Sequence, residues 1–168
     1  MDYWTQSLND GYPVDIIYLD FRKAFDSVPH NRLLMKLKAY GMGGSLLRWV
    51  QNFLSGRRQR IVLNGDHSSW STVSSGVPQG SVLGPLLFLL YVNDIPLSVD
   101  SPILLFADDA KIFRSIRCEA DYLQLQRDID ILFEWSRTWL LNFNISKCYV
   151  LHLGLTHSYG NYDYYDYD

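Results

Sequence analysis

The order of apolar and polar positions along the chain predicts alternating strands and helices. The apolar, β-branched run at 14–19 predicts a buried strand that ends at Asp20. Leucine and tyrosine side chains at helical spacing predict a helix over 30–40. A second amphipathic helix is expected to begin at Gly43-Gly44 and to end at Ser55-Gly56.

A hairpin and a buried helix are predicted in the middle of the chain. Segments 57–63 and 70–73 have the composition of two strands, joined around Asn64-Gly65-Asp66, which is a strong hairpin signal. A polar, glycine-rich loop follows, and Ser81 at its end can cap an almost wholly apolar helix that runs toward Asp94. We therefore expect this helix to cross the interior of the domain.

The last part of the chain predicts a second hairpin and a long helix. Short strands at 103–106 and 111–114 flank a tight turn at 107–110. Apolar residues at three- and four-residue steps predict a helix over 119–140, and a final strand is expected at 148–153. This order of elements predicts an α+β domain whose helices pack on one face of the sheet.

The segment 155–168 differs from the rest of the chain, with five Tyr and three Asp among its residues. We expect a disordered, solvated tail, because so few aliphatic side chains cannot offset the entropy of ordering the backbone. The sequence thus divides into a lead-in at 1–13, a folded domain at 14–154 and the tail.

Composition excludes several classes of protein. At 48% hydrophobic residues, the chain is not of the disordered type. The longest apolar run, 82–92, is 11 residues long, short of the roughly 20 that a membrane span needs, so no membrane partner is expected. Two cysteines, Cys118 and Cys148, favour a reducing, intracellular compartment. The net charge of −3 is unusual for a nucleic-acid binder, although the three Asp of the tail account for all of it.

Three aspartates stand apart from the turns and caps in which Asp is common. Asp20 ends a buried strand, and Asp108 and Asp109 lie at the tip of an apolar hairpin. Burying carboxylates there costs free energy unless cations compensate, and oxygen donors without neighbouring His or Cys suit Mg²⁺ or Mn²⁺. Two such ions would serve in-line phosphoryl transfer. A strand cap, an ordinary Asp-Asp turn and a generic Mg²⁺-dependent phosphohydrolase remain alternatives at this point.

Four sequence strings resemble the palm motifs of reverse transcriptases, and they occur in the order found in that family. The strings are YLDFRKAFD at 18–26, GVPQGSVLGP at 76–85, FADD at 106–109 and NFNISK at 142–147. The amino-acid sequences of these motifs are most similar to those of non-LTR, LINE-type retrotransposons. The resemblance implies a palm-type antiparallel sheet with helices on one face, a partial fingers region around 57–74 and no thumb, with 1–13 as a truncated piece of the fingers.

This resemblance implies an RNA-directed DNA polymerase that transfers dNTPs to a primer 3′-hydroxyl on an RNA template, with two Mg²⁺ or Mn²⁺ ions. It implies that Asp20 and Asp108 hold both ions, with Asp109 alongside and the backbone carbonyl of Phe21 as a further ligand. Lys147 would be the general acid for pyrophosphate. A solvated lysine is the alternative for Lys147.

Three further residues would contact the incoming nucleotide. The resemblance implies that the Phe25 ring excludes a 2′-hydroxyl and so selects dNTP over rNTP. Gln79 and Gly80 would contact the nucleotide and the template, since an amide can both donate and accept hydrogen bonds. The alternatives are an ordinary core aromatic for Phe25 and a plain loop before a helix cap for Gln79 and Gly80.

Arg57, Arg58 and Arg60 form a dense basic cluster. Alternation along a strand predicts Arg58 and Arg60 on one face and Arg57 on the other. In the family this region leads into a fingers hairpin, which implies contacts with template phosphates. A solvated strand edge blunted by charge is the alternative.

Two functional interpretations follow. The first is RNA-directed DNA polymerase chemistry, for which a nuclear location is plausible. The second is a truncated, inactive retroelement remnant that keeps the palm fold without productive nucleic-acid binding, since the family's full fingers and thumb have no counterpart among these motifs.

Overall fold

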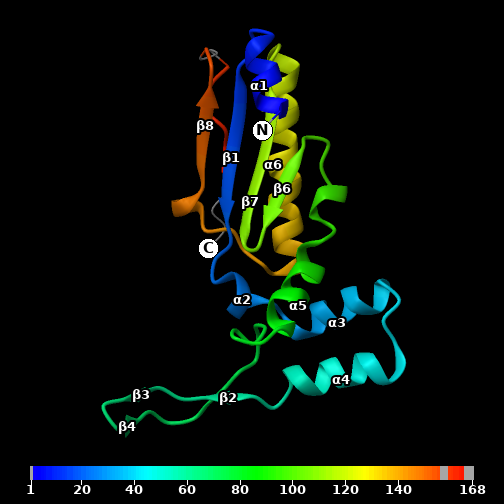
Figure 1. The fold of residues 1–168 in the computed structure, drawn as a ribbon, viewed down its shortest axis with the longest axis vertical. Coiled ribbons are helices and arrows are strands. Elements are labelled where there is room, and N and C mark those ends of the chain that lie inside the picture. The colour runs from blue at the N-terminus through cyan, green and yellow to red at the C-terminus, as the bar shows by residue number, and fades with distance from the viewer. Residues whose placement is uncertain (1, 156–158, 165–168) are drawn as a thin grey trace. The chain divides into compact units, whose positions relative to one another are not determined.

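The computed structural model describes residues 2–155 and 159–164, which form two compact units. The sheet unit combines the residues up to Arg22 with those from Asn93 onward, and the helical unit comprises Lys23–Val92. The domain expected as one body at 14–154 is thus organised as two units, each with its own elements (Figure 1).

The sheet unit is built on a four-stranded antiparallel sheet with the strand order β6-β7-β1-β8. Its strands are β1 (Val14–Asp20), β6 (Ile103–Phe106), β7 (Asp109–Ser115) and β8 (Tyr149–Leu153). The strand predicted at 14–19 is central, and its first four residues are all buried because β1 has a neighbour on each side and cover on each face. The α+β class and the antiparallel sheet are confirmed.

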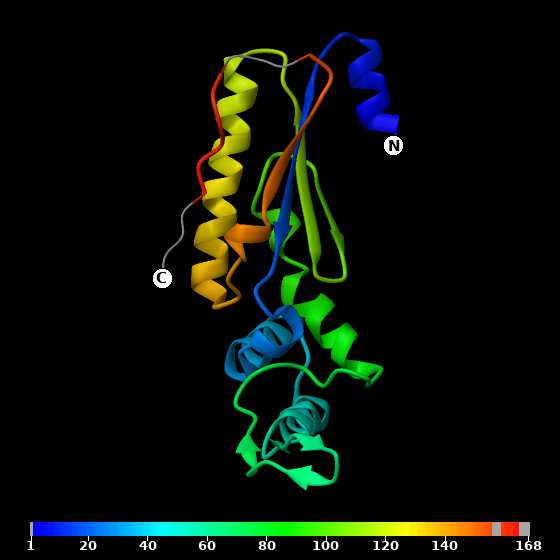
Figure 2. The ribbon, with the colours of Figure 1, turned by 90° about the vertical axis from the view of Figure 1, so that its left-hand side faces the viewer.

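Two helices of the sheet unit lie on opposite sides of this sheet (Figure 2). The long helix α6 (Glu119–Trp139) matches the predicted range and buries Leu125, Ile129 and Leu132, the spacing from which it was predicted. The N-terminal helix α1 (Asp2–Asn9) was not predicted. Its Trp4 packs edge-on against Phe113 of β7, with ring centroids 5.4 Å apart.

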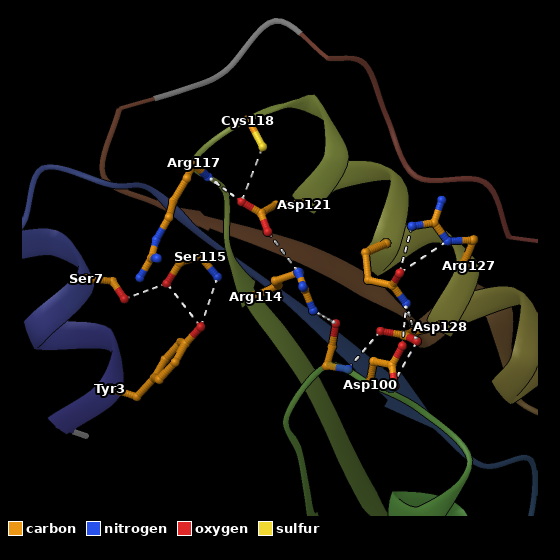
Figure 3. Close-up of polar contacts among 12 residues, drawn as sticks. Tyr3, Ser7, Asp100, Arg114, Ser115, Arg117, Cys118, Asp121, Arg127 and Asp128 are labelled. Carbon is orange, nitrogen blue, oxygen red and sulfur yellow. Dashed lines mark hydrogen bonds and ion pairs between the residues drawn. The ribbon is translucent and has the colours of Figure 1, made fainter.

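Two aspartates of α6 connect this helix to β7 and to the segment that precedes β6 (Figure 3). Asp121 accepts a hydrogen bond from Nε of Arg114 on β7 at 3.2 Å. Asp128 is fully buried and accepts the backbone N–H groups of Asp100 and Ser101, at 3.1 and 2.8 Å. Because buried carboxylates need such donors, these contacts set the position of α6 along the sheet.

Residues 159–164 lie along α6 and are held to it by side-chain contacts, although most of them keep an exposed side. Tyr162 is buried, and its hydroxyl donates to Oδ2 of the fully buried Asp15 at 2.6 Å. The Asp163 N–H donates to Oε1 of Gln126 on α6 at 2.9 Å. These residues therefore differ from the disordered tail expected there. A tyrosine side chain offers both apolar area for burial and a hydroxyl for hydrogen bonding, so Tyr162 can anchor the segment without aliphatic neighbours. Positions 156–158 and 165–168 of the expected tail lie outside the described residues.

Four α-helices occur in the described helical unit; three lie close to the ranges predicted from the sequence, and the short α2 was not predicted. They are α2 (Ala24–Ser27), α3 (His30–Ala39), α4 (Gly44–Leu54) and α5 (Leu83–Val92). Helix α5 buries Phe88 and Tyr91 but leaves Leu86 and Leu89 about half exposed, so the expected burial holds for one face only. None of the described helices combines the length and hydropathy that crossing a bilayer requires.

The predicted hairpin at 57–74 is present but interrupted. Strand β2 (Arg58–Gln59) pairs with β5 (Ser71–Thr72), and β3 (Val62–Leu63) pairs with β4 (Asp66–His67). Asn64 and Gly65 form the two-residue turn with φ of 50° and 91°, the left-handed pair that matches the twist of a hairpin. Between the ladders, the Ser68 N–H donates to Ile61 O at 2.9 Å, while Ser68 Oγ rather than a backbone carbonyl accepts the N–H of Ile61.

Candidate active site

Asp20 and Asp109 are direct partners across the antiparallel pair of β1 and β7. Directly opposed residues of such a pair point to the same side of the sheet, so both carboxylates lie on one face. Val14 and Ile16 share that face and pack with Trp4 of α1 at the other end of the sheet. The face is therefore apolar under α1 and acidic where β1 ends.

Asp108 occupies the turn that joins β6 to β7. The turn consists of Ala107 and Asp108, because Phe106 already pairs with Asp109. The predicted turn at 107–110 was too long by two residues, since Asp109 and Ala110 belong to β7. Ala107 has φ of 53°, a left-handed conformation that costs a non-glycine residue roughly 1–2 kcal/mol. This backbone places half-buried Asp108 next to Asp109.

The fourth motif lies against the end of β1. The N–H of Arg22 donates to Asn142 O at 2.8 Å, and the N–H of Asn144 donates to Asp20 O at 2.7 Å. Between these bonds, the ring of Phe21 stacks on Phe143 at a centroid distance of 4.7 Å. These contacts fix the backbone on both sides of Phe21, whose carbonyl was predicted as a metal ligand.

Lys147 lies beside Asp20. It ends the short helix η2 (Ile145–Lys147), and its Nζ is 3.5 Å from Asp20 Oδ2. Its neighbour Cys148 is partly buried, and burial raises the pKa of the Cys148 thiol, which disfavours a thiolate there. The charged group that the fold brings to the Asp20 carboxylate here is the Lys147 ammonium.

A cavity of about 370 Å³ joins these groups. Its lining includes Asp20, Asp109 and Lys147, together with Tyr18, Lys111 and Tyr149. The Tyr18 and Tyr149 rings stack at 4.5 Å, and Lys111 Nζ lies 4.8 Å from the Tyr18 centroid. The sequence alone did not single out these three residues. The strand register places two of them on the same face as the aspartates, because Tyr18 lies two positions before Asp20 and Lys111 lies two positions after Asp109.

The donor chemistry of this cavity suits a hard divalent cation. Asp20 and Asp109 offer carboxylate oxygens, the ligands that Mg²⁺ prefers, and Asp108 is on the adjoining turn. Within 2–155 and 159–164, however, no three His, Cys, Asp or Glu side chains are grouped closely enough to hold a metal ion by themselves. The residues fit a cation that is completed by ligands from outside the chain, such as substrate phosphates.

The predicted substrate residues belong to the helical unit, where the second motif lies along the segment after Lys23. Gly76 N–H donates to Val28 O at 2.8 Å, and Val77 N–H donates to Phe25 O at 2.7 Å. Gly76 has φ of 85°, and a Cβ there would lie 2.7 Å from backbone atoms of Asp26. Only glycine allows this approach of two chain segments.

A compact turn precedes α5. Ser81 Oγ accepts the N–H of Gly84 at 2.9 Å and donates to Pro78 O at 2.8 Å, which confirms its predicted capping role. Gln79 is exposed, and its Nε2 donates to Asp26 Oδ1 at 3.1 Å. Gly80 is exposed with φ of 79°. Both predicted contact residues are thus accessible within their unit.

Phe25 is half-buried and packs against Phe88 of α5, with centroids 4.7 Å apart. One side of the ring is thus supported by the core of the helical unit. A ring anchored in this way is rigid, which a steric selection of the sugar requires.

The three arginines divide as alternation predicted. The guanidinium carbons of Arg58 and Arg60 lie 5.5 and 4.7 Å from the ring centroid of Trp70. Arg57 instead donates to Gly76 O at 3.3 Å. Trp70 was not singled out from sequence, although a half-exposed tryptophan across a hairpin from two arginines is a recognisable signal.

Charge is distributed unevenly between the two units. The helical unit, Lys23–Val92, holds eight Lys and Arg against two Asp, a net charge of +6 within a chain whose net charge is −3. A count by segment could have found this basic region from the sequence. A positively charged surface is typical of proteins that contact nucleic acid.

Comparisons with known proteins show which family this chain is similar to. Residues 9–164 match the family described as "Reverse transcriptase (RNA-dependent DNA polymerase)". The chain is 37% identical over 145 residues to a probable RNA-directed DNA polymerase from transposon X-element of Drosophila melanogaster, covering 80% of this chain and 16% of that protein. It is 32% identical over 140 residues to the RNA-directed DNA polymerase from mobile element jockey of Drosophila funebris, covering 78% and 15%. The chain thus spans about a sixth of the length of these relatives.

The fold is also similar to solved structures. Apo telomerase from Candida Tropicalis superposes with a TM-score of 0.65 at 14% identity, covering 94% of this chain and 35% of that one. At this identity the likeness concerns the fold.

Proposed function

Since the chain belongs to the reverse transcriptase family, with non-LTR retrotransposon polymerases as its relatives, we propose that it forms the catalytic palm for RNA-directed DNA synthesis. The proposed reaction adds dNTPs to a primer 3′-hydroxyl on an RNA template. The observation that carries the proposal is the pairing of Asp20 with Asp109 on one face, with Lys147 3.5 Å from Asp20 in the same cavity.

In this proposal Asp20, Asp108 and Asp109 hold two Mg²⁺ or Mn²⁺ ions, with the Phe21 carbonyl as a further ligand. When bound, such ions lower the pKa of the primer hydroxyl and neutralise charge on the leaving pyrophosphate. The β1–β7 register keeps Asp20 and Asp109 on one face, and the backbone bonds around Phe21 hold the end of β1 in place. The chain thereby supplies a preorganised set of carboxylates.

Lys147 is the proposed proton donor. Its side chain is two-thirds exposed, so the ammonium group can reach a phosphate oxygen above the cavity as well as Asp20. The contact with Asp20 Oδ2 at 3.5 Å keeps this amino group close to the centre. A positioned general acid of this kind typically contributes about 10²–10⁴-fold to a rate.

Three residues of the helical unit are proposed to select the nucleotide. Phe25, supported by Phe88, excludes a 2′-hydroxyl by its bulk. Gln79 offers an exposed amide, and Gly80 leaves room beside it because no atom lies within 4 Å of a Cβ built there. Phe25→Ala should therefore raise rNTP incorporation relative to dNTP; equal discrimination in both proteins would rule out the steric role.

Arg57, Arg58 and Arg60 are proposed to contact phosphates of the RNA template. The stacking of Arg58 and Arg60 against Trp70 orders both guanidinium groups on an otherwise exposed hairpin. Their basic surroundings, net +6 in the helical unit, favour approach of a polyanion.

The proposal is tested by primer extension with the purified chain, a primed RNA template, dNTPs and Mg²⁺ or Mn²⁺. Extension that requires the RNA template and the metal is the expected result. A chain that is folded by circular dichroism but does not extend the primer would contradict the proposal and favour an inactive remnant. Hydrolysis of p-nitrophenyl phosphate without extension would favour a phosphohydrolase instead.

A further inference from the structure

A second polar cavity lies in the helical unit, at the base of the hairpin. Its volume is about 490 Å³, within the range of about 300–1,000 Å³ typical of ligand pockets. Two cationic residues from distant parts of the sequence, Lys23 and Arg57, both line it. Hydroxyl groups from Ser27, Thr72 and Ser74 complete a lining rich in hydrogen-bond donors.

The frame of this cavity is fixed by backbone contacts. Ser75 Oγ donates to Asp26 O at 2.8 Å, and Ser75 forms an antiparallel bridge with Pro29. Gly76 closes against the Asp26 backbone at a distance that admits no side chain. The Gly76 carbonyl in turn accepts hydrogen bonds from Arg57 Nη1 at 3.3 Å and His30 Nε2 at 2.8 Å. A cavity held in this way does not have to form when a ligand arrives, which lowers the entropy cost of binding.

Charge and backbone conformation both distinguish Lys23. Its φ of 50° is left-handed, a state that costs a non-glycine residue free energy and that occurs preferentially at functional sites. The acidic residue of the lining is Asp26, whose Oδ1 already accepts the amide of Gln79 at 3.1 Å. The lining is therefore net positive, within a unit of net charge +6.

We propose that this cavity is a phosphate-binding site in which Lys23 and Arg57 together hold a backbone phosphate of the RNA template. The proposal rests on the proposed function and adds Lys23 to it as a template contact. Phosphate chemistry is shared by two sources, a phosphodiester of the RNA and the triphosphate of a nucleotide. The position of Arg57 at the base of the hairpin, next to Arg58 and Arg60, favours the extended polyanion.

The test is fluorescence anisotropy with a 5′-labelled, single-stranded RNA of twelve nucleotides, in EDTA, across a series of salt concentrations. Lys23→Gln and Arg57→Gln should each weaken binding by about tenfold, the worth of one charged hydrogen bond. Each should also lower the slope of log K against log salt by about 0.7, the value for one phosphate contact on a single strand. Lys38→Gln and Arg48→Gln are matched controls, because both side chains are exposed in the same unit and do not line the cavity.

A second arm measures binding of a fluorescent dNTP, the N-methylanthraniloyl derivative of dATP, to the same variants. Loss of RNA binding with unchanged dNTP binding supports the proposal. Loss of dNTP binding alone would reassign the cavity to the nucleotide and overturn the template assignment. Variants that match their controls in both arms would overturn the site itself. Because EDTA prevents catalysis, the result is independent of whether the chain extends a primer.

Discussion

Gly76 provides a sharp test of how the second motif is held. In Gly76→Ala, the new methyl group would lie 2.7 Å from Asp26 Cα, 2.7 Å from Asp26 O and 2.9 Å from Asp26 C. All three are backbone atoms, so no side chain can rotate away, and the backbone bonds from Gly76 to Val28 and from Val77 to Phe25 must be strained or broken.

The magnitude follows from two contributions. The left-handed φ of 85° costs alanine roughly 1–2 kcal/mol relative to glycine. Forcing a methyl group into a closed contact costs about 1–3 kcal/mol more. Gly41→Ala is the matched control, because Gly41 has φ of 87° and no atom within 4 Å of the built Cβ, so it isolates the first contribution.

Urea unfolding followed by circular dichroism measures both variants. We expect Gly76→Ala to lower the free energy of unfolding by about 2–5 kcal/mol, and by about 1–3 kcal/mol more than Gly41→Ala. A Gly76→Ala variant no less stable than Gly41→Ala would refute the close approach of these two segments.

Four further predictions concern the sheet unit. Tyr162→Phe removes the hydroxyl that donates to buried Asp15 and should cost about 1–3 kcal/mol of unfolding free energy, whereas Tyr12→Phe, at an exposed tyrosine, should change it by less than about 0.5 kcal/mol. Burial and the bond to Asp15 raise the pKa of Tyr162, so the contribution of this tyrosine to the free energy of unfolding is complete below about pH 10 and should decline at higher pH. The difference in unfolding free energy between wild type and Tyr162→Phe, measured across this pH range, gives that contribution. Burial also raises the pKa of Cys148, so iodoacetamide should modify it more slowly than exposed Cys118 at pH 8; equal rates by mass spectrometry would contradict its buried setting. Lys147→Gln should change the unfolding free energy by less than about 1 kcal/mol, because the lysine side chain of its ion pair with Asp20 is largely exposed. The same variant should slow single-turnover extension by about 10²–10⁴-fold. An unchanged extension rate would exclude the proton-donor role.

Much of the fold could be predicted because local patterns coincide with tertiary packing. The run at 14–19 is buried on both faces in the structure, and the stripe of Leu125, Ile129 and Leu132 faces the sheet. Elements that are stabilised by contacts with residues far away in the sequence were not predicted. Helix α1 depends on Trp4 meeting Phe113, and the segment 159–164 depends on Tyr162 reaching Asp15, 147 positions earlier in the chain.

The candidate site was predictable as a list of residues but not as an arrangement. Asp20, Asp109 and Lys147 come together only through the β1–β7 register and the backbone bonds of Asn142 and Asn144. Tyr18, Lys111 and Tyr149 carry no motif of their own and enter the cavity through strand pairing alone. Lys23 was included in a motif string, but its role beside Arg57 depends on the hairpin base.

The central claim is that the carboxylates at the end of β1 and at the β6–β7 turn catalyse nucleotide addition. Its most direct test is the single-turnover rate of primer extension for Asp20→Asn and Asp108→Asn, beside Asp10→Asn, which removes the same charge from an exposed turn of the same unit. We predict that extension is lost in the first two variants and kept in the third, with all three folded by circular dichroism. Extension at the wild-type rate in Asp20→Asn or Asp108→Asn would contradict the account.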